Sequence, residues 1–223
     1  MMSPEVTRVV EDYTTLIWKA YEWPGRIPTT TDLAAQLDVT PSTVSATLKK
    51  LAFDGFINYE PYGQIELTDA GRSVAIDIVR RHRILETYLN QKLDVPWDQV
   101  HAEADRLEHA ISNDILDRMD RALGYPTTDP HGDPIPDANG DKPPDSSVSL
   151  IESEPGTRVR VTRISDRSSD ILRYLDGHKI TIGSVMDVTD INPAAEIIGI
   201  TVGDASTQLS FKTADAIRVA PNL

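Results

Sequence analysis

The stretch Pro41-Ser42-Thr43-Val44-Ser45-Ala46-Thr47-Leu48-Lys49-Lys50 decides how the N-terminal part of the chain folds. Val44, Leu48 and Leu51 recur at three- and four-residue spacing, which predicts a helix over 42–53 with one buried face. The opposite face carries small hydroxyl residues and two lysines, which are side chains that reach base edges and phosphates in DNA complexes. The stretch is therefore a candidate recognition helix.

The flanking residues complete a winged helix-turn-helix. A short helix over 33–37 precedes the recognition helix and is joined to it by a tight turn. Strands over 56–59 and 64–68 predict the hairpin of the wing, and an amphipathic helix over 5–23 comes first. A three-helix bundle with an ordinary polar face is the competing interpretation. The predicted DNA contacts are Thr40, Pro41, Ser42, Thr43, Ser45, Thr47, Lys49 and Lys50.

Composition narrows the class of protein. The 223 residues are 39% hydrophobic and include no cysteine, which excludes disulfides and thiolate metal sites. We expect a cytoplasmic protein, since no apolar run suits a membrane span and no signal peptide is visible. The formal net charge of −13 lowers the expectation of DNA binding without deciding it, because phosphate contact needs a basic surface. Residues 126–147 concentrate five of the aspartates.

The remainder of the chain changes from helices to strands. Long helices are predicted over 69–93 and 98–123, and residues 126–147 hold six of the 15 prolines and predict a linker or irregular loop. A short helix is predicted over 169–176. Short segments rich in Val, Ile and Thr predict a small β-barrel, with strands at 156–163, 180–191, 196–202, 207–212 and 216–219.

One face of the 98–123 helix carries a group of potential metal ligands. Each residue advances about 100° around a helix, so His101, Asp105, Glu108 and His109 fall within an arc of about 100°. That arc borders an apolar stripe, so the group lies next to the predicted packing surface.

Two other helices can add ligands to this group. His82 and Glu86 lie one turn apart at the edge of the apolar stripe of the 69–93 helix. Asp12 lies at the edge of the first helix's stripe, whereas Glu11 points nearly the opposite way. Imidazole and carboxylate together suit a divalent transition ion, and so many packed anions are costly without a cation. A solvated surface of salt bridges is the competing interpretation.

These motifs together resemble the DtxR-type metal-dependent repressors of bacteria. The resemblance covers nearly the whole chain and includes Arg81-His82-Arg83-x-x-Glu86, Val100-His101-x-Glu103-Ala104-x-x-x-Glu108-His109 and Pro134-Ile135-Pro136. It implies a mostly α fold with β. The implied domains are a winged helix-turn-helix DNA-binding domain (1–71), a helical metal-binding and dimerisation domain with its linker (72–147), and an SH3-like, FeoA-like domain (148–223).

The resemblance also implies two metal sites in each subunit. The switching site would be formed by Asp12, Asp105, Glu108 and His109, and the second site by His82, Glu86 and His101. In three-domain members the SH3-like domain adds a Glu and a Gln to the second site. Neither residue occurs in the matching segment 167–171, so Asp166 and Asp170 are the alternative donors.

The implied metal is Mn²⁺. Iron-responsive members typically place a Met at the position of Asp12 and a Cys at the position of Asp105. Hard oxygen with imidazole suits Mn²⁺ better than a site with sulfur does. Fe²⁺ stays open, because Mn²⁺ is the weaker binder in the Irving–Williams order.

The expected function is a manganese-dependent repressor that binds a palindromic operator as a homodimer and controls metal-uptake genes, without a membrane, a small-molecule substrate or an enzymatic role. An Fe²⁺-dependent repressor, a binuclear metallohydrolase and a metal-binding adaptor acting through the SH3-like domain are the alternatives. His131 and His178 are predicted to be ordinary surface residues. Four residues are predicted either at the dimer interface or in the core of one subunit: Ile111, Ile115, Leu116 and Met119.

Overall fold

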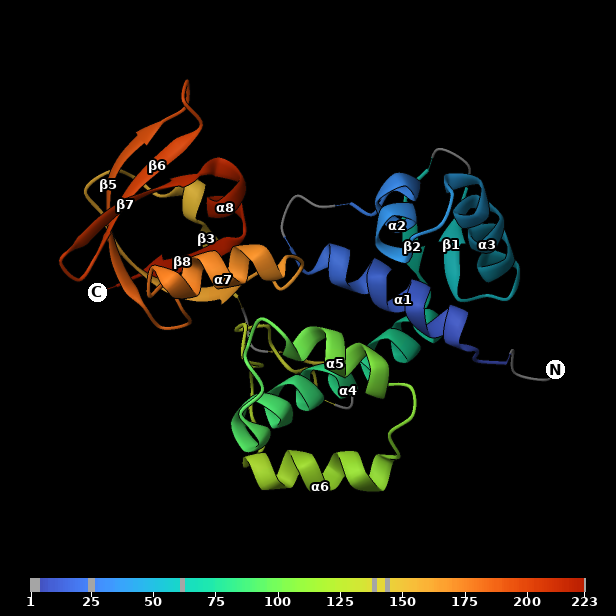
Figure 1. The fold of residues 1–223 in the computed structure, drawn as a ribbon. Coiled ribbons are helices and arrows are strands. Elements are labelled where there is room, and N and C mark those ends of the chain that lie inside the picture. Colours follow the sequence, from blue (N-terminus) through green and yellow to red (C-terminus); the bar gives the residue numbers. More distant parts are fainter. Residues whose placement is uncertain (1–4, 24–26, 61–62, 138–139, 143–144, 223) are drawn as a thin grey trace. The chain divides into compact units, whose positions relative to one another are not determined.

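The computed structural model describes residues 5–23, 27–60, 63–137, 140–142 and 145–222, and Figure 1 shows its fold. The chain divides into two compact units, Met1–Arg81 with Pro136–Asp141 and His82–Ile135 with Lys142–Leu223. Pro61 and Tyr62 of the predicted wing, and residues 138–139 and 143–144 of the predicted linker, lie outside the described residues.

The first unit contains the predicted winged helix-turn-helix. Its elements are α1 (Arg8–Tyr21), α2 (Thr30–Leu37), α3 (Pro41–Phe53), the antiparallel strands β1 (Ile57–Tyr59) and β2 (Ile65–Leu67), and the beginning of α4 (Asp69–Leu93). They enclose a shared core that includes Ile17, Leu33, Val44, Leu48 and Phe56. The three- and four-residue spacing of the apolar positions in 42–53 therefore places the two lysines and the hydroxyl residues outside this core.

Threonine caps set the two helices of the helix-turn-helix. The Thr29 hydroxyl accepts a hydrogen bond from the Asp32 backbone N–H at 3.1 Å, and the Thr40 hydroxyl accepts one from the Thr43 N–H at 3.2 Å. Pro41 occupies the first turn of α3, where its missing N–H costs nothing. The predicted tight turn thus supplies both the end of α2, at Asp38, and the beginning of α3, at Thr40.

The start of α4 is packed tightly against the wing. The Thr68 hydroxyl donates to the Gly55 carbonyl at 2.7 Å and accepts from the Gly71 N–H at 3.2 Å. A Cβ on Gly71 would lie 2.0 Å from the Phe56 carbonyl oxygen. Only glycine allows α4 to begin this close to the hairpin.

The second unit corrects the prediction of one helix over 98–123. Two helices are present, α5 (Val100–Leu107) and α6 (Asn113–Leu123). Ser112 caps α6 by accepting from the Ile115 N–H at 3.4 Å, and a serine cap of this kind starts a new helix. Leu116 packs with Ile84 and Ile135 in a small core, while Ile115 remains 44% exposed. Leu116 is therefore a core residue of one subunit.

The C-terminal part of the second unit is a small β domain, as predicted. Its six-stranded antiparallel sheet has the order β3-β8-β4-β5-β6-β7. The strands are β3 (Val148–Ser149), β4 (Arg158–Ile164), β5 (Val185–Asn192), β6 (Ile197–Val202), β7 (Ala205–Ser210) and β8 (Ile217–Pro221), with the 3-10 turn η1 (Leu150–Glu152) and the helices α7 (Ser169–Gly177) and α8 (Phe211–Asp215). Leu172, Leu175 and Ala214 place both helices in the core of the sheet.

Two strand predictions in this domain are wrong in extent. The strand expected over 180–191 begins only at Val185. The strand expected over 207–212 ends at Ser210, whose hydroxyl accepts from the Thr213 N–H at 3.2 Å and caps α8. In both places a local side-chain cap or turn overrides the β-branched composition.

Of the two predictions for residues 126–147, a linker or an irregular loop, the structure shows an irregular loop that is packed into the fold over much of its described length. A β-bridge joins Thr128 to Pro134, and residues 131–136 are buried. The loop 129–133 therefore belongs to the packed interior of the second unit. None of the helices in the described part of the chain combines the length and apolarity that crossing a bilayer requires.

Candidate metal centre

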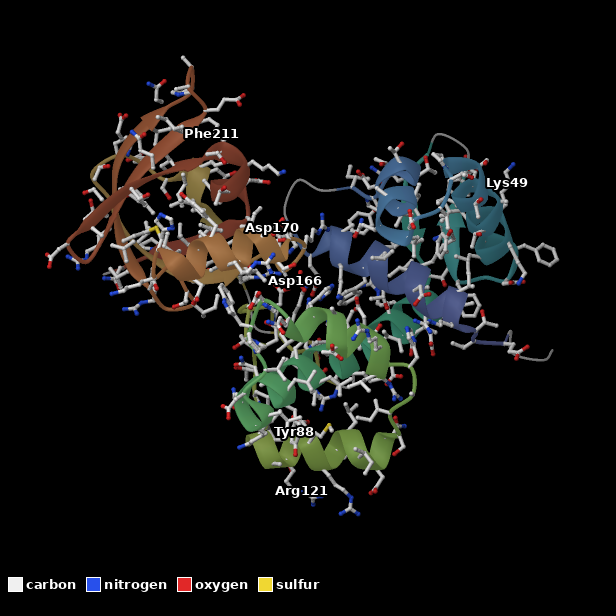
Figure 2. All side chains as sticks on the ribbon, viewed as in Figure 1. Lys49, Tyr88, Arg121, Asp166, Asp170 and Phe211 are labelled. Atoms are coloured by element: carbon white, nitrogen blue, oxygen red, sulfur yellow. The ribbon has the colours of Figure 1, made fainter. Side chains whose placement is uncertain are left out.

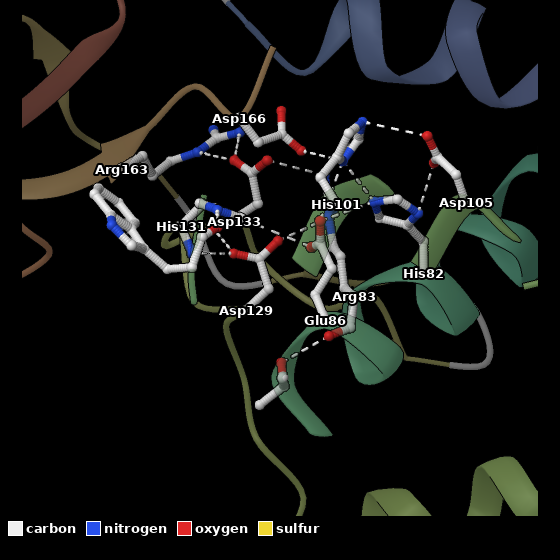
Figure 3. Close-up of polar contacts among 12 residues, drawn as sticks. His82, Arg83, Glu86, His101, Asp105, Asp129, His131, Asp133, Arg163 and Asp166 are labelled. Atoms are coloured by element: carbon white, nitrogen blue, oxygen red, sulfur yellow. Dashed lines mark hydrogen bonds and ion pairs between the residues drawn. The ribbon is translucent and has the colours of Figure 1, made fainter. Parts of the chain in front are cut away.

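Four potential ligands converge between α4, α5 and the end of β4 (Figure 3). His82 and Glu86 lie one turn apart on α4, His101 is on α5, and Asp166 follows β4. The His101 Nδ1 atom lies 3.0 Å from His82 Nε2, 3.2 Å from Glu86 Oε1 and 2.9 Å from Asp166 Oδ2. We refer to these four residues as the α4–β4 group.

The chemistry of the α4–β4 group fits a divalent ion. Two imidazole nitrogens that face each other at 3.0 Å can share one proton or can both direct lone pairs to a cation. Ligand atoms around a first-row ion at about 2.0–2.2 Å are themselves about 3 Å apart, which is the spacing found here. His82 is 1% exposed and Glu86 is 0% exposed, so water does little to offset the charges.

A second group lies on the other side of the His82 ring. His82 Nδ1 lies 2.6 Å from Glu108 Oε2 and 3.3 Å from Asp105 Oδ1. His109 is adjacent, with Nε2 3.4 Å from Glu108 Oε1. The structure thus brings three of the four residues of the predicted switching site together and adds His82 to them. We refer to His82, Asp105 and Glu108 as the α5 group.

Asp12, the fourth residue of the predicted switching site, lies on α1 in the first unit, where its Oδ2 is 3.9 Å from Arg8 Nε. Its membership of the metal centre stays a prediction.

A third group, Glu86, Asp129 and His131, corrects the prediction for His131. His131 is 0% exposed rather than a surface residue, because its ring stacks on Trp97 and its Nε2 lies 2.7 Å from the Trp97 carbonyl oxygen. A carbonyl only accepts, so Nε2 carries a proton, and in the neutral form of the ring Nδ1 keeps its lone pair. Nδ1 points toward Glu86 Oε2 at 3.9 Å, and within the described residues both of these buried atoms have no hydrogen-bond partner.

Such a histidine, with one ring nitrogen on a backbone carbonyl and the other free, has the usual arrangement of a metal ligand. Asp129 and His131 were missed because they lie in the proline-rich segment, where composition predicts a loop. The available signal was Asp129-Pro130-His131-Gly132-Asp133: Asp129 Oδ1 accepts from the His131 and Asp133 N–H groups at 2.8 and 2.9 Å, which is a turn that aspartate favours.

The buried carboxylates of the centre differ in pKa. Burial alone raises the pKa of Glu86, but the neighbouring His82, hydrogen bonds from His101 and His82, and His131 together hold it well below its usual range. Burial, together with the charges of Asp133 and Glu86, raises the pKa of Asp129 well above its usual range, despite the opposing effect of Arg83. The surroundings therefore favour the charged form of Glu86 and disfavour the charged form of Asp129.

The structure distinguishes the two alternative donors from the C-terminal domain, which Figure 2 labels. Asp166 joins the α4–β4 group. The Asp170 side chain is 91% exposed and pairs with Arg173 at 2.5 Å. Asp170 is thus placed away from the metal ligands, and His178, the other predicted surface histidine, is half-buried with Nδ1 2.8 Å from the Tyr174 carbonyl oxygen.

The predicted DNA contacts lie on α3 and at its N-terminus. Ser42, Thr43, Lys49 and Lys50 are exposed, and Figure 2 labels Lys49 on this helix. The Ser45 and Thr47 hydroxyls donate to carbonyls of their own helix, those of Pro41 and Thr43, at 2.9 and 3.0 Å. Thr40 caps α3. Lys50 Nζ is 3.6 Å from Asp54 Oδ2, so part of its charge is balanced within the protein.

A winged helix-turn-helix followed by a buried cluster of histidines and carboxylates defines a class of protein, the metal-dependent DNA-binding regulators. Three family descriptions match consecutive parts of the chain: "Iron dependent repressor, N-terminal DNA binding domain" at 5–65, "Iron dependent repressor, metal binding and dimerisation domain" at 68–137, and "FeoA domain" at 148–221.

Individual proteins agree with this assignment. The chain is 32% identical over 206 residues to the iron-dependent repressor IdeR of Mycobacterium leprae (strain TN), an alignment that spans 87% of this chain and 90% of the relative. It is 29% identical over 205 residues to the diphtheria toxin repressor of Corynebacterium efficiens (strain DSM 44549 / YS-314 / AJ 12310 / JCM 11189 / NBRC 100395), over 87% and 88% of the two chains. A solved manganese-dependent transcriptional repressor in complex with manganese is 38% identical with a TM-score of 0.90, over 96% of this chain and 100% of that one.

The chain therefore belongs to the DtxR/IdeR family of metal-dependent DNA-binding repressors, and it carries the family's DNA-binding, metal-binding and dimerisation, and FeoA domains. Members of this family are transcriptional repressors and not enzymes, so the metallohydrolase alternative is set aside. The relatives' names include both iron and manganese, and the choice of ion rests on the donor atoms of this chain.

Proposed function

We propose that this repressor is activated by Mn²⁺. The observation that carries the proposal is the donor set: the three ligand groups contain only imidazole nitrogens and carboxylate oxygens, and the chain has no cysteine. Hard oxygen donors with imidazole suit Mn²⁺, whereas sulfur ligands favour softer ions. The manganese-bound repressor of similar structure supports the same choice.

Two ions per subunit would occupy the centre. One would be held by Asp12, Asp105, Glu108 and His109, and the other by the α4–β4 group. Asp129 and His131 would offer further ligand atoms on the other side of the Glu86 carboxylate, where its Oε2 atom lies. When bound, the ions supply the positive charge that this set of buried carboxylates lacks.

The switch would act on the position of the DNA-reading domain. Without an ion, Asp12 on α1 and the carboxylates of the α5 group repel one another. An ion held by both sets joins α1 to α5 and fixes the spacing of two α3 helices in a homodimer. A two-fold dimer reads a palindromic operator, here proposed to control metal-uptake genes in the cytoplasm.

The direct test is operator binding titrated in parallel with Mn²⁺ and with anaerobic Fe²⁺. Genomic fragments selected by the Mn²⁺-loaded protein provide the operator. Mn²⁺ should activate binding at free concentrations where Fe²⁺ does not, and preferential activation by Fe²⁺ would replace this proposal with an iron-responsive repressor. Asp12→Ala should lose the Mn²⁺ response, and Mn²⁺-dependent repression that survives this substitution would contradict the switch assignment.

A further inference from the structure

A buried aspartate joins two buried arginines beside the metal centre. Asp133 Oδ1 accepts from Arg163 Nε at 2.7 Å and lies 2.5 Å from Arg163 Nη2, while Asp133 Oδ2 lies 3.6 Å from Arg83 Nη2. Asp133 is 6% exposed, Arg163 is 4% exposed and Arg83 is 1% exposed. We refer to these three residues as the arginine–aspartate bridge, and Figure 3 shows its place beside the ligands.

The bridge connects two of the three segments that carry ligands of the α4–β4 group, α4 and the end of β4. On α4, Arg83 follows His82 directly and precedes Glu86 by three residues. On β4, Arg163 precedes Asp166 by three residues. Arg83 also donates from Nη1 to the Pro134 carbonyl at 2.6 Å, so both ends of the bridge hold the same loop.

The backbone of this loop is seated directly on β4. The Ile164 N–H donates to the His131 carbonyl at 2.9 Å. Gly132 has a φ of +84°, and a Cβ there would lie 2.1 Å from the Thr162 carbonyl oxygen. Loop 129–133 and the end of β4 therefore form one packed contact, and a displacement of either moves the Asp166 side of the centre.

A buried ion pair is weak evidence for stability, because desolvation offsets much of the attraction between its charges. Its geometric effect is larger, since the donors of the Arg163 guanidinium lie in one rigid plane and two of them reach different carboxylates, Nε that of Asp133 and Nη1 that of Asp145. Asp145 restrains Arg163 further, with Oδ2 3.0 Å from Nη1. The end of β4, three residues before Asp166, is thus held in place by contacts that do not involve Asp166 itself.

We infer that Asp133 and Arg163 are positioning residues of the metal centre: they hold Asp166 at the α4–β4 group and so set the affinity of that group for its divalent ion. The inference rests on the proposed metal-dependent function. Because coupling is reciprocal, ion binding in turn strengthens the attachment of the β domain to the metal-binding helices.

The test measures Mn²⁺ binding to the full chain by calorimetry and equilibrium dialysis. Arg163→Lys keeps the charge but loses the planar guanidinium that reaches Asp133 and Asp145 together. It should weaken Mn²⁺ binding at the α4–β4 group by about 10–100-fold, the usual effect of losing a residue that orients a metal ligand. Asp133→Asn is a nearly isosteric second variant with the same expected effect. Arg160→Lys is the matched control, since Arg160 lies on the exposed face of the same strand, where Nη2 donates to Asn222 at 2.7 Å.

A double-mutant cycle with Asp166→Asn separates positioning from general structural support. If Arg163 acts through Asp166, Arg163→Lys should have no further effect on Mn²⁺ affinity in the Asp166→Asn background. An equal loss in both backgrounds, or unchanged affinity in the single variants, overturns the inference. Thermal unfolding of the metal-free variants checks that each one folds.

The outcomes also distinguish this inference from the proposed function. If Asp166→Asn binds Mn²⁺ like the wild type, then Asp166 is not a ligand and the positioning inference fails. If the wild type binds Mn²⁺ with the expected coupling but operator binding does not respond to Mn²⁺, only the proposed function fails. Asp170→Asn is the control for Asp166→Asn and should leave both Mn²⁺ binding and operator binding unchanged.

Discussion

Gly132→Ala tests the contact between loop 129–133 and β4 more directly than any charge substitution. The new methyl carbon would lie 2.1 Å from the Thr162 carbonyl oxygen, far below the 3.0 Å that real Cβ contacts respect. Backbone cannot yield as a flexible side chain does, so the loop must move away from the strand. That movement breaks the hydrogen bond from Ile164 to the His131 carbonyl.

The expected loss of stability can be assembled from its parts. Alanine in the left-handed region costs about 1–2 kcal/mol. The lost hydrogen bond adds about 1 kcal/mol, which gives a total of about 2–3 kcal/mol before any strain from the steric overlap. For a folding unit of this size, 1 kcal/mol corresponds to about 2–4 °C in melting temperature, so we expect a decrease of about 4–12 °C.

The matched control is Gly156→Ala. Gly156 has the same φ of +84°, but a Cβ there would meet nothing within 4 Å. It therefore carries the backbone cost without the clash, and the unfolded-state entropy of the Gly-to-Ala change cancels between the two variants. Differential scanning calorimetry of the metal-free proteins gives both melting temperatures. Equal destabilisation by the two substitutions would refute the proposed close packing of the loop on β4.

Three further predictions address DNA binding, metal choice and acid stability. Lys49→Ala should weaken operator binding and should reduce the slope of log binding constant against log salt concentration by about one unit, as loss of one phosphate contact does. Lys212→Ala in the β domain is the control and should change neither quantity. Fluorescence anisotropy measures both. The double substitution Asp12→Met with Asp105→Cys introduces soft sulfur and should raise the response to anaerobic Fe²⁺ relative to Mn²⁺; an unchanged ratio in operator titrations would argue against donor softness as the basis of selection. The third prediction is that Asp145 stabilises the protein less in acid. Burial raises the pKa of Asp145, but hydrogen bonds from Ser147 and the Arg163 guanidinium lower it below the usual value. The stabilising contribution of Asp145 is therefore present above the unfolded pKa of about 3.9, and it is lost as the pH falls through the lower folded pKa. Melting temperatures of wild type and Asp145→Asn should accordingly converge on acidification, and a gap that persists at low pH would contradict this.

The features that could be predicted from sequence are those with local causes. The caps at Thr29 and Thr40, with an apolar period through Leu51, identify the helix-turn-helix without tertiary information. The one-turn spacing of His82 and Glu86 likewise placed both residues in one buried group.

The features that were missed depend on contacts between distant segments. Ser112 is a helix cap by sequence, but the apolar period of 98–123 continues across it and hid the break. The burial of His131 depends on Trp97, 34 residues away, which no local pattern reports. The sequence left two candidates, Asp166 and Asp170, for the ligand from the C-terminal domain. It could not choose between them, because the approach of Asp166 to His101 depends on how β4 packs against α4 and α5.

His82 lies between two ligand groups, so the position of one proton on its ring affects both of them. A neutral imidazole carries a single N–H, so Nε2 can offer its lone pair to an ion on the side of Glu86 and His101 only when the proton is on Nδ1, which then donates it to Glu108, 2.6 Å away. Withdrawing Glu108 from this hydrogen bond changes the tautomer preference of the ring, and with it the electron pair offered on the opposite side. The α5 group and the α4–β4 group are thus coupled through the position of one proton on the His82 ring.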